Sequence, residues 1–549
     1  MTTTRQTTAE AIVATLLAHG IDTLYALPGV HNDHLFDAAH KAADRFRVIH
    51  PRHEQAAAYM ALGAALATGK PQAFAVVPGP GILNASAALL MAKAMCAPVL
   101  ALVGQIPSFA IDQGHGHLHE IHDQLGLLRH ITKHAERIRS PSEAGPKTAA
   151  ALHAARSGRP GAVALECAID VWGQIGDTTT PDPIAVDNPA ADATAIQAAA
   201  ALLRQAKRPV IVAGAGALGA SRELQAVAER LHAPVISFRR GRGAIPTGHP
   251  LAVSFTEGHA LWKTADAVLA VGTRLYWQQA NWGTDEALKI IRLDIDPEEI
   301  TRLRHPDRAL LGDAAATLSA LDTVLATSGG TWSPNPALPP ARTAFAARLA
   351  RHEPVMGFLR AIRSALPEDG IFVEDVTQIG FAARLAFPVP APRTYHSPGY
   401  QDTLGWGYGT ALGVQAACPD RKVVLATGDG GFMYQATELA TAMRHKIPLV
   451  VVVFDDGAFG NVRRIQAEQY GNRLIASDLA NPDFVAYAKS FGMAAFKAAT
   501  PEALETALKD AFALNAPALI HVPVGEMPSP WDMILLPRVR GGQGRLPLP

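Results

Sequence analysis

Residues 421–460 read RKVVLATGDGGFMYQATELATAMRHKIPLVVVVFDDGAFG, and this stretch decides the fold. Two apolar runs, 423–427 and 449–454, are continuous, as expected for strands that are buried on both faces of a parallel sheet. Between them, residues 434–445 follow a helical pattern. The order strand, helix, strand therefore predicts an α/β unit with parallel strands.

Both strands end in turns that are rich in glycine and aspartate. A turn such as Gly428, Asp429, Gly430, Gly431 lets backbone amides approach phosphate oxygens at the start of a helix. The next strand ends at Asp456, 27 residues after Asp429. Because the carboxyl ends of parallel strands meet at one rim, both carboxylates should lie together there. Two carboxylates and a backbone carbonyl predict a site for Mg²⁺.

The same alternation of strands and helices appears twice more, earlier in the chain. It runs from Gly20 to about Val171 and restarts after the polar, proline-containing stretch 176–189. We therefore predict an α/β protein with three doubly wound parallel-sheet domains. The predicted boundaries are a first domain at 1–180, a central domain at 190–327, a Pro-, Gly- and Ser-rich linker at 328–342 and a third domain at 343–549.

Composition argues for a small-molecule partner. The chain has 549 residues, and its 49 Lys and Arg balance 49 Asp and Glu. No long-range field therefore favours nucleic acid or an anionic membrane. No apolar run is long enough to span a membrane, and the N-terminus opens with a capping box, Thr7 to Glu10, in place of a signal peptide. We expect a cytoplasmic protein whose three cysteines, Cys96, Cys167 and Cys418, are buried core thiols.

With these residues in view, the third domain resembles the diphosphate-binding domain of thiamine-diphosphate enzymes. The signature of that family is GDG followed after about 27 residues by an Asn-Asn pair. The resemblance implies that Asp429, Asp456 and the carbonyl of Ala458 bind magnesium, with Asp456 replacing the usual Asn. It also implies cofactor contacts, which we assign to Gly428, Gly430, Gly431, Phe459 and Gly460.

The first domain resembles the pyrimidine-binding domain of acetolactate synthases. The run PRHEQ, residues 51–55, places Glu54 on the glutamate that activates the cofactor in that family by hydrogen bonding to its aminopyrimidine ring. The segment LGWGYGTALG places Leu404 on the large apolar residue over which the cofactor bends. Three further cofactor-binding positions are implied: Pro28, Gly79 and Asn84. A Rossmann-like central domain completes the resemblance.

The substrate side departs from the synthases. His31 stands in a loop where the synthases have non-titrating residues, and His119 replaces a glutamine. Histidines titrate near neutrality and can move a proton or hold a carboxylate. We therefore predict catalytic roles for His31 and His119, and for the retained Gln466, whereas a role for His34 is less favoured. Ile465 replaces the tryptophan that selects the second 2-oxo acid in the synthases.

The resemblance implies a carboligase or lyase that acts on 2-oxo acids or related carbonyl compounds. Alternatives are a non-ligating 2-oxo acid decarboxylase, a diketone-cleaving hydrolase, and a flavin-linked oxidase. FAD is the less expected cofactor, because the RFDDR pattern of flavin-containing synthases is missing and the central GAGALG turn is weak evidence alone. A catalytically silent cofactor-binding protein is disfavoured by the presence of Glu54. The family also implies a homodimer or homotetramer with active sites shared between subunits.

Overall fold

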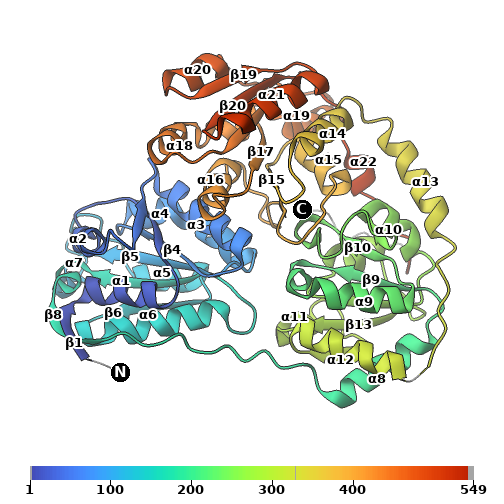
Figure 1. Ribbon diagram of the computed structural model, residues 1–549, viewed down its shortest axis with the longest axis horizontal. Coiled ribbons are helices and arrows are strands. Elements are labelled where there is room, and N and C mark those ends of the chain that lie inside the picture. Colours follow the sequence, from blue (N-terminus) through green and yellow to red (C-terminus); the bar gives the residue numbers. More distant parts are fainter. Residues whose placement is uncertain (1–2, 328, 542–549) are drawn as a thin grey trace.

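The computed structural model describes residues 3–327 and 329–541. Three six-stranded parallel sheets, each flanked by helices, follow one another along the chain (Figure 1). The predicted fold class is therefore confirmed. The calls on the first and last residues and on Ser328 lie outside the described residues. Within the described ranges no helix is long and apolar enough to cross a membrane.

The sheet of the first domain has the strand order β3-β2-β4-β5-β7-β6. A separate antiparallel pair, β1 with β8, closes this domain. The predicted capping box is confirmed, because the Thr7 hydroxyl accepts the Glu10 N–H and Glu10 accepts the Thr7 N–H. The elements of the first domain are β1 (Thr3–Thr7), α1 (Thr8–Ala18), β2 (Thr23–Ala26), α2 (Asp33–Lys41), β3 (Arg47–Ile49), α3 (Glu54–Thr68), β4 (Gln72–Val76), α4 (Pro80–Ala94), β5 (Val99–Gln105), η1 (Ser108–Ala110), α5 (Gln124–Ile131), β6 (His134–Ile138), α6 (Pro141–Arg156), β7 (Val163–Ala168), α7 (Ile169–Trp172) and β8 (Ile175–Thr179).

The central sheet has the order β11-β10-β9-β12-β13-β14. Its middle strands are apolar throughout and buried, which is typical of a sheet covered on both faces. The elements are α8 (Ala193–Gln205), β9 (Pro209–Ala213), η2 (Ala215–Ala220), α9 (Ser221–Leu231), β10 (Val235–Ser237), η3 (Arg239–Gly241), β11 (Ala252–Val253), α10 (Phe255–Trp262), β12 (Ala267–Val271), η4 (Gln278–Trp282), β13 (Lys289–Asp294), α11 (Pro297–Thr301), β14 (Arg308–Leu311) and α12 (Ala314–Thr327).

The third sheet has the order β16-β15-β17-β18-β20-β19, so the two strands of the opening stretch are neighbours, as predicted. The elements are α13 (Leu338–Leu349), α14 (Val355–Ala365), β15 (Ile371–Glu374), α15 (Gln378–Ala386), β16 (Tyr395–His396), α16 (Gly407–Ala417), β17 (Val423–Gly428), α17 (Asp429–Met433), η5 (Ala436–Glu438), α18 (Leu439–His445), β18 (Val450–Asp455), α19 (Gly460–Gln469), α20 (Phe484–Ser490), β19 (Ala494–Lys497), α21 (Pro501–Leu514), β20 (Ala518–Pro523) and α22 (Trp531–Ile534).

Helices α3 and α16 join the first domain to the third. Every residue of α3 from Ala56 to Ala67 is buried, because the helix packs on its own sheet and on α16. The two helices cross at glycines: a Cβ at Gly63 would lie 2.0 Å from the Thr410 carbonyl oxygen, and one at Gly413 would lie 1.9 Å from that of Met60. Small residues are therefore required for this close approach.

Four features differ from the sequence expectations. The helix after the Gly-rich turn begins at Asp429 itself and breaks into α17, η5 and α18. Helix α13 begins at Leu338, inside the predicted linker. The C-terminal segment that holds α22 returns to the central domain, where Met533 packs with the core. The prediction of buried thiols holds for Cys167 but is wrong for Cys96 and Cys418, which are half-buried where domains meet.

Candidate active site

Glu54 begins helix α3 at the carboxyl edge of the first sheet. The neighbouring His53 caps the helix, since its Nδ1 accepts the Gln55 N–H. Asn84 Nδ2, from α4, donates to Glu54 Oε2 at 3.1 Å. Two predicted site residues that are 30 positions apart in the chain therefore meet, and the amide orients the carboxylate.

The third domain holds the segment that precedes Glu54. The buried carboxylate of Glu438 accepts the backbone N–H groups of Arg52, at 2.9 Å, and His53, at 3.0 Å. Burial raises the pKa of Glu438, and these hydrogen bonds oppose that shift. The position of Glu54 therefore depends on a side chain nearly 400 residues away in sequence.

His31 and His119 form a stacked pair beside this glutamate-bearing edge. Their ring centroids lie 5.0 Å apart, and His31 is only 3% exposed. The Nδ1 atoms of both rings are buried without a hydrogen-bond partner in the described part of the chain. Burial lowers the pKa of His31, and the neighbouring His119 lowers it further. Burial therefore favours the neutral form of His31, and the stacked rings place nitrogen donors and acceptors side by side.

Gly79 makes the histidine pair possible. Gly79 has φ +60°, and a Cβ there would lie 2.7 Å from the His119 carbonyl oxygen. His119 itself has φ +67°, which is uncommon for a residue with a side chain. The turn before α4 and the loop after η1 thus contact each other through backbone atoms. Pro28 is exposed in the turn between β2 and His31.

Asp429 and Asp456 lie together at the carboxyl edge of the third sheet. Asp429 is 2% exposed, and its Oδ2 accepts Asn481 Nδ2 at 2.6 Å and the Gly457 N–H at 3.1 Å. Asp456 Oδ1 accepts the Ala458 N–H at 3.1 Å. The two carboxylates therefore lie at the same sheet edge, as predicted.

The electrostatics of this acidic rim favour a cation. Burial raises the pKa of Asp429 to about 7, with Asp456 adding to the rise, and burial also raises the pKa of Asp456. Within the described ranges the Ala458 carbonyl accepts no hydrogen bond. Two carboxylates with raised pKa values and a carbonyl that accepts no hydrogen bond form an all-oxygen donor set, which suits a hard divalent ion.

The glycine turn and Leu404 flank the acidic rim. Gly428 ends β17. A Cβ at Gly430 would lie 2.8 Å from the ring of Phe459, so the glycine turn contacts the segment 456–460 that follows β18. Gly460 begins α19. Leu404 is half-buried in the loop before α16. The predicted cofactor-binding residues of this domain thus gather at one sheet edge.

Sequence reasoning missed two residues of the acidic rim. Asn481 Nδ2 also donates to Asp455 Oδ1 at 2.9 Å, so one amide bridges two acids from neighbouring strands. Asp375 follows β15, and its Oδ2 accepts Thr427 Oγ1 at 2.9 Å; burial raises its pKa to about 6. Asp375 could have been found by the strand-end rule, whereas Asn481 lies in a loop with no such signal.

Two predicted or weighed residues lie outside these clusters. Both amide atoms of Gln466 bond the backbone of Ile475, with Nε2 donating at 3.0 Å and Oε1 accepting at 3.1 Å. Gln466 thus shapes the loop after α19, and its catalytic role stays a prediction. The exposed His34 lies over Gly173, directly after α7.

The fold and these two edges define a class of protein. Parallel α/β domains with a glycine turn and an acidic pair at one edge, and a glutamate at another, suit an enzyme with a diphosphate cofactor. Family models agree over most of the chain: the N-terminal TPP binding domain of thiamine pyrophosphate enzymes matches residues 6–127, the central domain matches 196–321, and the C-terminal TPP binding domain matches 375–522.

The chain belongs to the thiamine pyrophosphate enzyme family, whose members related to this chain form or cleave carbon–carbon bonds. It is 32% identical to a probable 2-ketoarginine decarboxylase from Pseudomonas aeruginosa, over 94% of each chain. It is 33% identical to a probable acetolactate synthase large subunit from Methanocaldococcus jannaschii, over 94% of this chain and 91% of the relative. Identity to the acetolactate synthase isozyme 1 large subunit of Escherichia coli is 28%, over 96% of each chain.

Proposed function

We propose that this chain is a thiamine-diphosphate- and Mg²⁺-dependent carboligase or lyase that acts on 2-oxo acids or related carbonyl compounds. The observation that carries the proposal is the presence of both halves of a cofactor site. The Glu54–Asn84 pair stands at one sheet edge, and the Asp429–Asp456 pair stands at another.

The acidic rim fits the metal and the diphosphate. Asp429, Asp456 and the Ala458 carbonyl would hold Mg²⁺, whose charge would offset the burial and the neighbouring carboxylates that raise both carboxyl pKa values. The backbone amides of Gly430 and Gly431 would face phosphate oxygens. When bound, the cofactor supplies a carbon nucleophile that attacks a carbonyl carbon.

Glu54 would hold or release a proton at the aminopyrimidine ring. Its carboxylate is oriented by Asn84, and its helix is anchored by Glu438 through Arg52 and His53. An oriented acid of this kind performs general acid–base catalysis, because the proton moves over a fixed hydrogen-bond distance.

The histidine pair favours a second candidate function: a non-ligating 2-oxo acid decarboxylase or a diketone-cleaving hydrolase. His31 is buried with a lowered pKa, His119 stacks on it, and the Nδ1 atom of each ring has no hydrogen-bond partner in the described residues. They could deliver a proton to the reacting carbon where a ligase would admit an aldehyde or a second keto acid. The printed name of the Pseudomonas aeruginosa relative, a decarboxylase, agrees with this outcome for that protein.

Product analysis tests both candidates. The holoenzyme is incubated with pyruvate, larger 2-oxo acids and 1,2-diketones, with and without aldehydes, and the products are identified by mass. Hydroxy-ketones support the carboligase. Aldehydes and CO₂ formed from the 2-oxo acids support the decarboxylase, and carboxylic acids formed by cleavage of the diketones support the hydrolase. No turnover of any of these carbonyl compounds would contradict the whole proposal.

The surroundings of both edges support a homodimer with shared sites. Apolar side chains are exposed near each, with Phe109 at 76% and Leu118 at 64% near the histidine pair and Ile475 at 74% near α19. Helix α19, which follows Asp456 and Ala458, has no buried residue. A second copy of the chain would cover such surfaces and bury more than roughly 2,000 Å² of interface.

Mixing inactive subunits tests the shared site. Glu54→Gln and Asp429→Ala chains are each purified and then combined under conditions that allow subunit exchange. If one site takes Glu54 from one chain and Asp429 from the other, mixed dimers carry one intact site and regain part of the activity. Exchange without recovery would place both residues of a site on one chain. Light scattering of the wild type separates a dimer from a tetramer.

A further inference from the structure

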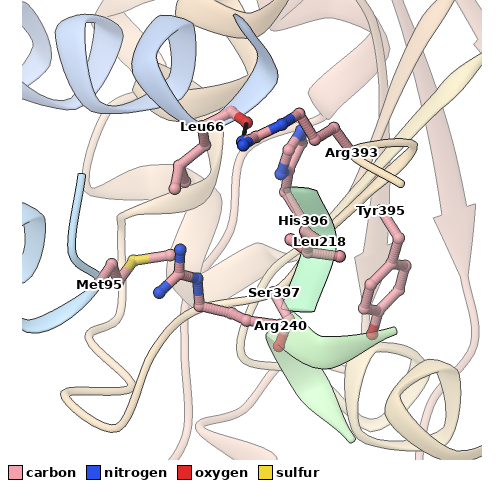
Figure 2. A pocket seen from close by; sticks show the side chains of 8 residues that line it. All are labelled: Leu66, Met95, Leu218, Arg240, Arg393, Tyr395, His396 and Ser397. Atoms are coloured by element: carbon pink, nitrogen blue, oxygen red, sulfur yellow. Dashed lines mark hydrogen bonds between the residues drawn. The ribbon is translucent and has the colours of Figure 1, made fainter. Parts of the chain in front are cut away.

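A small cavity lies where the three domains meet (Figure 2). The first domain contributes apolar side chains, the central domain contributes Arg240, and the third contributes Arg393 and a short polar run. No carboxylate lines it in the described part of the chain. The lining residues are Leu66, Met95, Leu218, Arg240, Arg393, Tyr395, His396 and Ser397.

Arg240 has no counter-charge. The structure gives its guanidinium no hydrogen bond, no ion pair with a carboxylate and no ring contact within the described ranges. Its neighbours in the run FRRGR differ: Arg239 donates to Asp402 at 2.8 Å, and Arg242 donates to the Ala383 carbonyl at 2.7 Å. Burial lowers the pKa of Arg240 to about 10, and Arg393 contributes to that shift. A half-buried cation without a partner loses part of its hydration and gains no counter-charge in return.

The other polar groups of the cavity are also unsatisfied. The Tyr395 hydroxyl and His396 Nε2 are buried without a hydrogen-bond partner. Burial lowers the pKa of His396 to about 3, so its ring is neutral near pH 7. Arg393 uses one nitrogen on the Leu66 carbonyl at 3.0 Å, which leaves its other donors available (Figure 2). Together these groups offer donors on several sides of one space.

The acids around this junction are engaged with other arginines, and Glu374, beside Ser397 and Tyr395, pairs with Arg384. Glu299 and Asp296 pair with Arg159, and Glu299 also lies 3.7 Å from Arg274. The Cys96 sulfur accepts Arg159 Nε at 3.1 Å. The protein therefore supplies several cations at this junction and no free anion for Arg240.

We propose that this cavity binds one small inorganic oxyanion of the phosphate class, held by Arg240 and Arg393 with Tyr395 and His396, and that the anion fastens the three domains together. The size agrees. The cavity has a volume of about 20 Å³. That is room for one or two waters or one compact anion, and it excludes a flavin or a nucleotide unless Arg240 moves.

The test uses the holoenzyme, saturated with thiamine diphosphate and Mg²⁺, so that inorganic phosphate cannot act at the cofactor site. Thermal unfolding is followed in chloride buffers of constant ionic strength while inorganic phosphate is added to millimolar levels. We expect a saturable rise in Tm of roughly 2 °C or more, because a ligand that binds only the folded state stabilises it. Calorimetric titration should give one phosphate per chain.

Two variants and a control decide the outcome. Arg240→Leu should abolish both the Tm rise and the titration, Arg240→Lys should retain part of each, and Arg45→Leu, on the exposed surface of the first domain, should behave as wild type. Equal phosphate effects in wild type and Arg240→Leu, or none in either, would overturn the proposal. So would tight binding of ADP or FAD that requires Arg240, because the cavity would then be a nucleotide site.

Discussion

The carboxyl edges of the first and third sheets occupy the same place in two similar folds, yet they are chemically opposite. The first carries Glu54, an amide and two stacked histidines whose Nδ1 atoms have no hydrogen-bond partner in the described residues. The third carries Asp429, Asp455 and Asp456, and burial together with the neighbouring carboxylates raises the pKa of Asp429 to about 7.

The comparison teaches that the parallel sheet supplies a position and the loop residues supply the chemistry. The third edge gathers carboxylates, so it suits a metal ion and the diphosphate that the ion would bind. The first edge carries one carboxylate beside a stacked histidine pair, and it suits proton transfer. In the proposed function a single cofactor would need both, which is why each edge alone would be inactive.

The largest expected effect removes the acid at the centre of the third edge. Asp429→Ala should lose Mg²⁺-dependent retention of thiamine diphosphate, with affinity falling more than about 100-fold, because the diphosphate then lacks the charge of its ion. Equilibrium dialysis with and without Mg²⁺ measures this. Retention close to that of the wild type would mean that the third edge is not the metal site.

At the first edge, Glu54→Gln should leave cofactor binding largely intact. Hydrogen–deuterium exchange at the acidic carbon of the bound cofactor should slow by about 10²–10⁴-fold, since a positioned proton-transfer group is lost. NMR of quenched samples measures the exchange. Compared with Asp429→Ala, this result would show that the third edge binds the cofactor and the first edge activates it. Exchange at the normal rate would refute this division.

His119→Gln should slow any product that ends in protonation, by about 10²-fold, and increase the share of ligated products. The substitution removes a proton donor and restores the amide found in the resembling synthases. The measurement is the ratio of products by mass, with His34→Gln as a matched control because His34 is exposed and away from the pair. An unchanged ratio would assign His119 a packing role.

The histidine pair should also weaken the protein in acid. His31 has a lowered pKa, so below about pH 6.5 the unfolded chain binds a proton that the folded chain does not, and stability falls as pH falls. His31→Gln should remove part of that loss, by roughly 1–2 °C in Tm at mildly acidic pH, with no difference above pH 7. Thermal scans of both proteins across this range measure it. A larger fall in Tm at acidic pH in His31→Gln than in the wild type would contradict this prediction.

The smallest effect is expected for Asp456→Asn, which restores the usual residue of the family. Mg²⁺ and cofactor affinity should change by less than about tenfold, since an amide oxygen also binds hard cations. Dialysis alongside Asp429→Ala is the comparison. Loss of cofactor as complete as in Asp429→Ala would show that this chain has come to depend on its second carboxylate.

The sequence by itself predicted the three parallel sheets and most of the two edges. Continuous apolar runs mark buried strands, and residues directly after neighbouring parallel strands must meet at one rim, so Asp429 and Asp456 could be paired from their positions alone. The roles of Glu54 and Leu404 came from resemblance, because neither a helix start nor a loop leucine indicates a cofactor.

Only the tertiary structure decided what long loops and domain junctions bring together. The stacking of His31 on His119, the amide of Asn481 between two acids and the unpaired charge of Arg240 all depend on contacts between distant segments. The turn of Gln466 toward Ile475 was decided in the same way, by how one loop folds back on α19. Strand-end rules do not reach such contacts, because a loop's path is set by the packing around it.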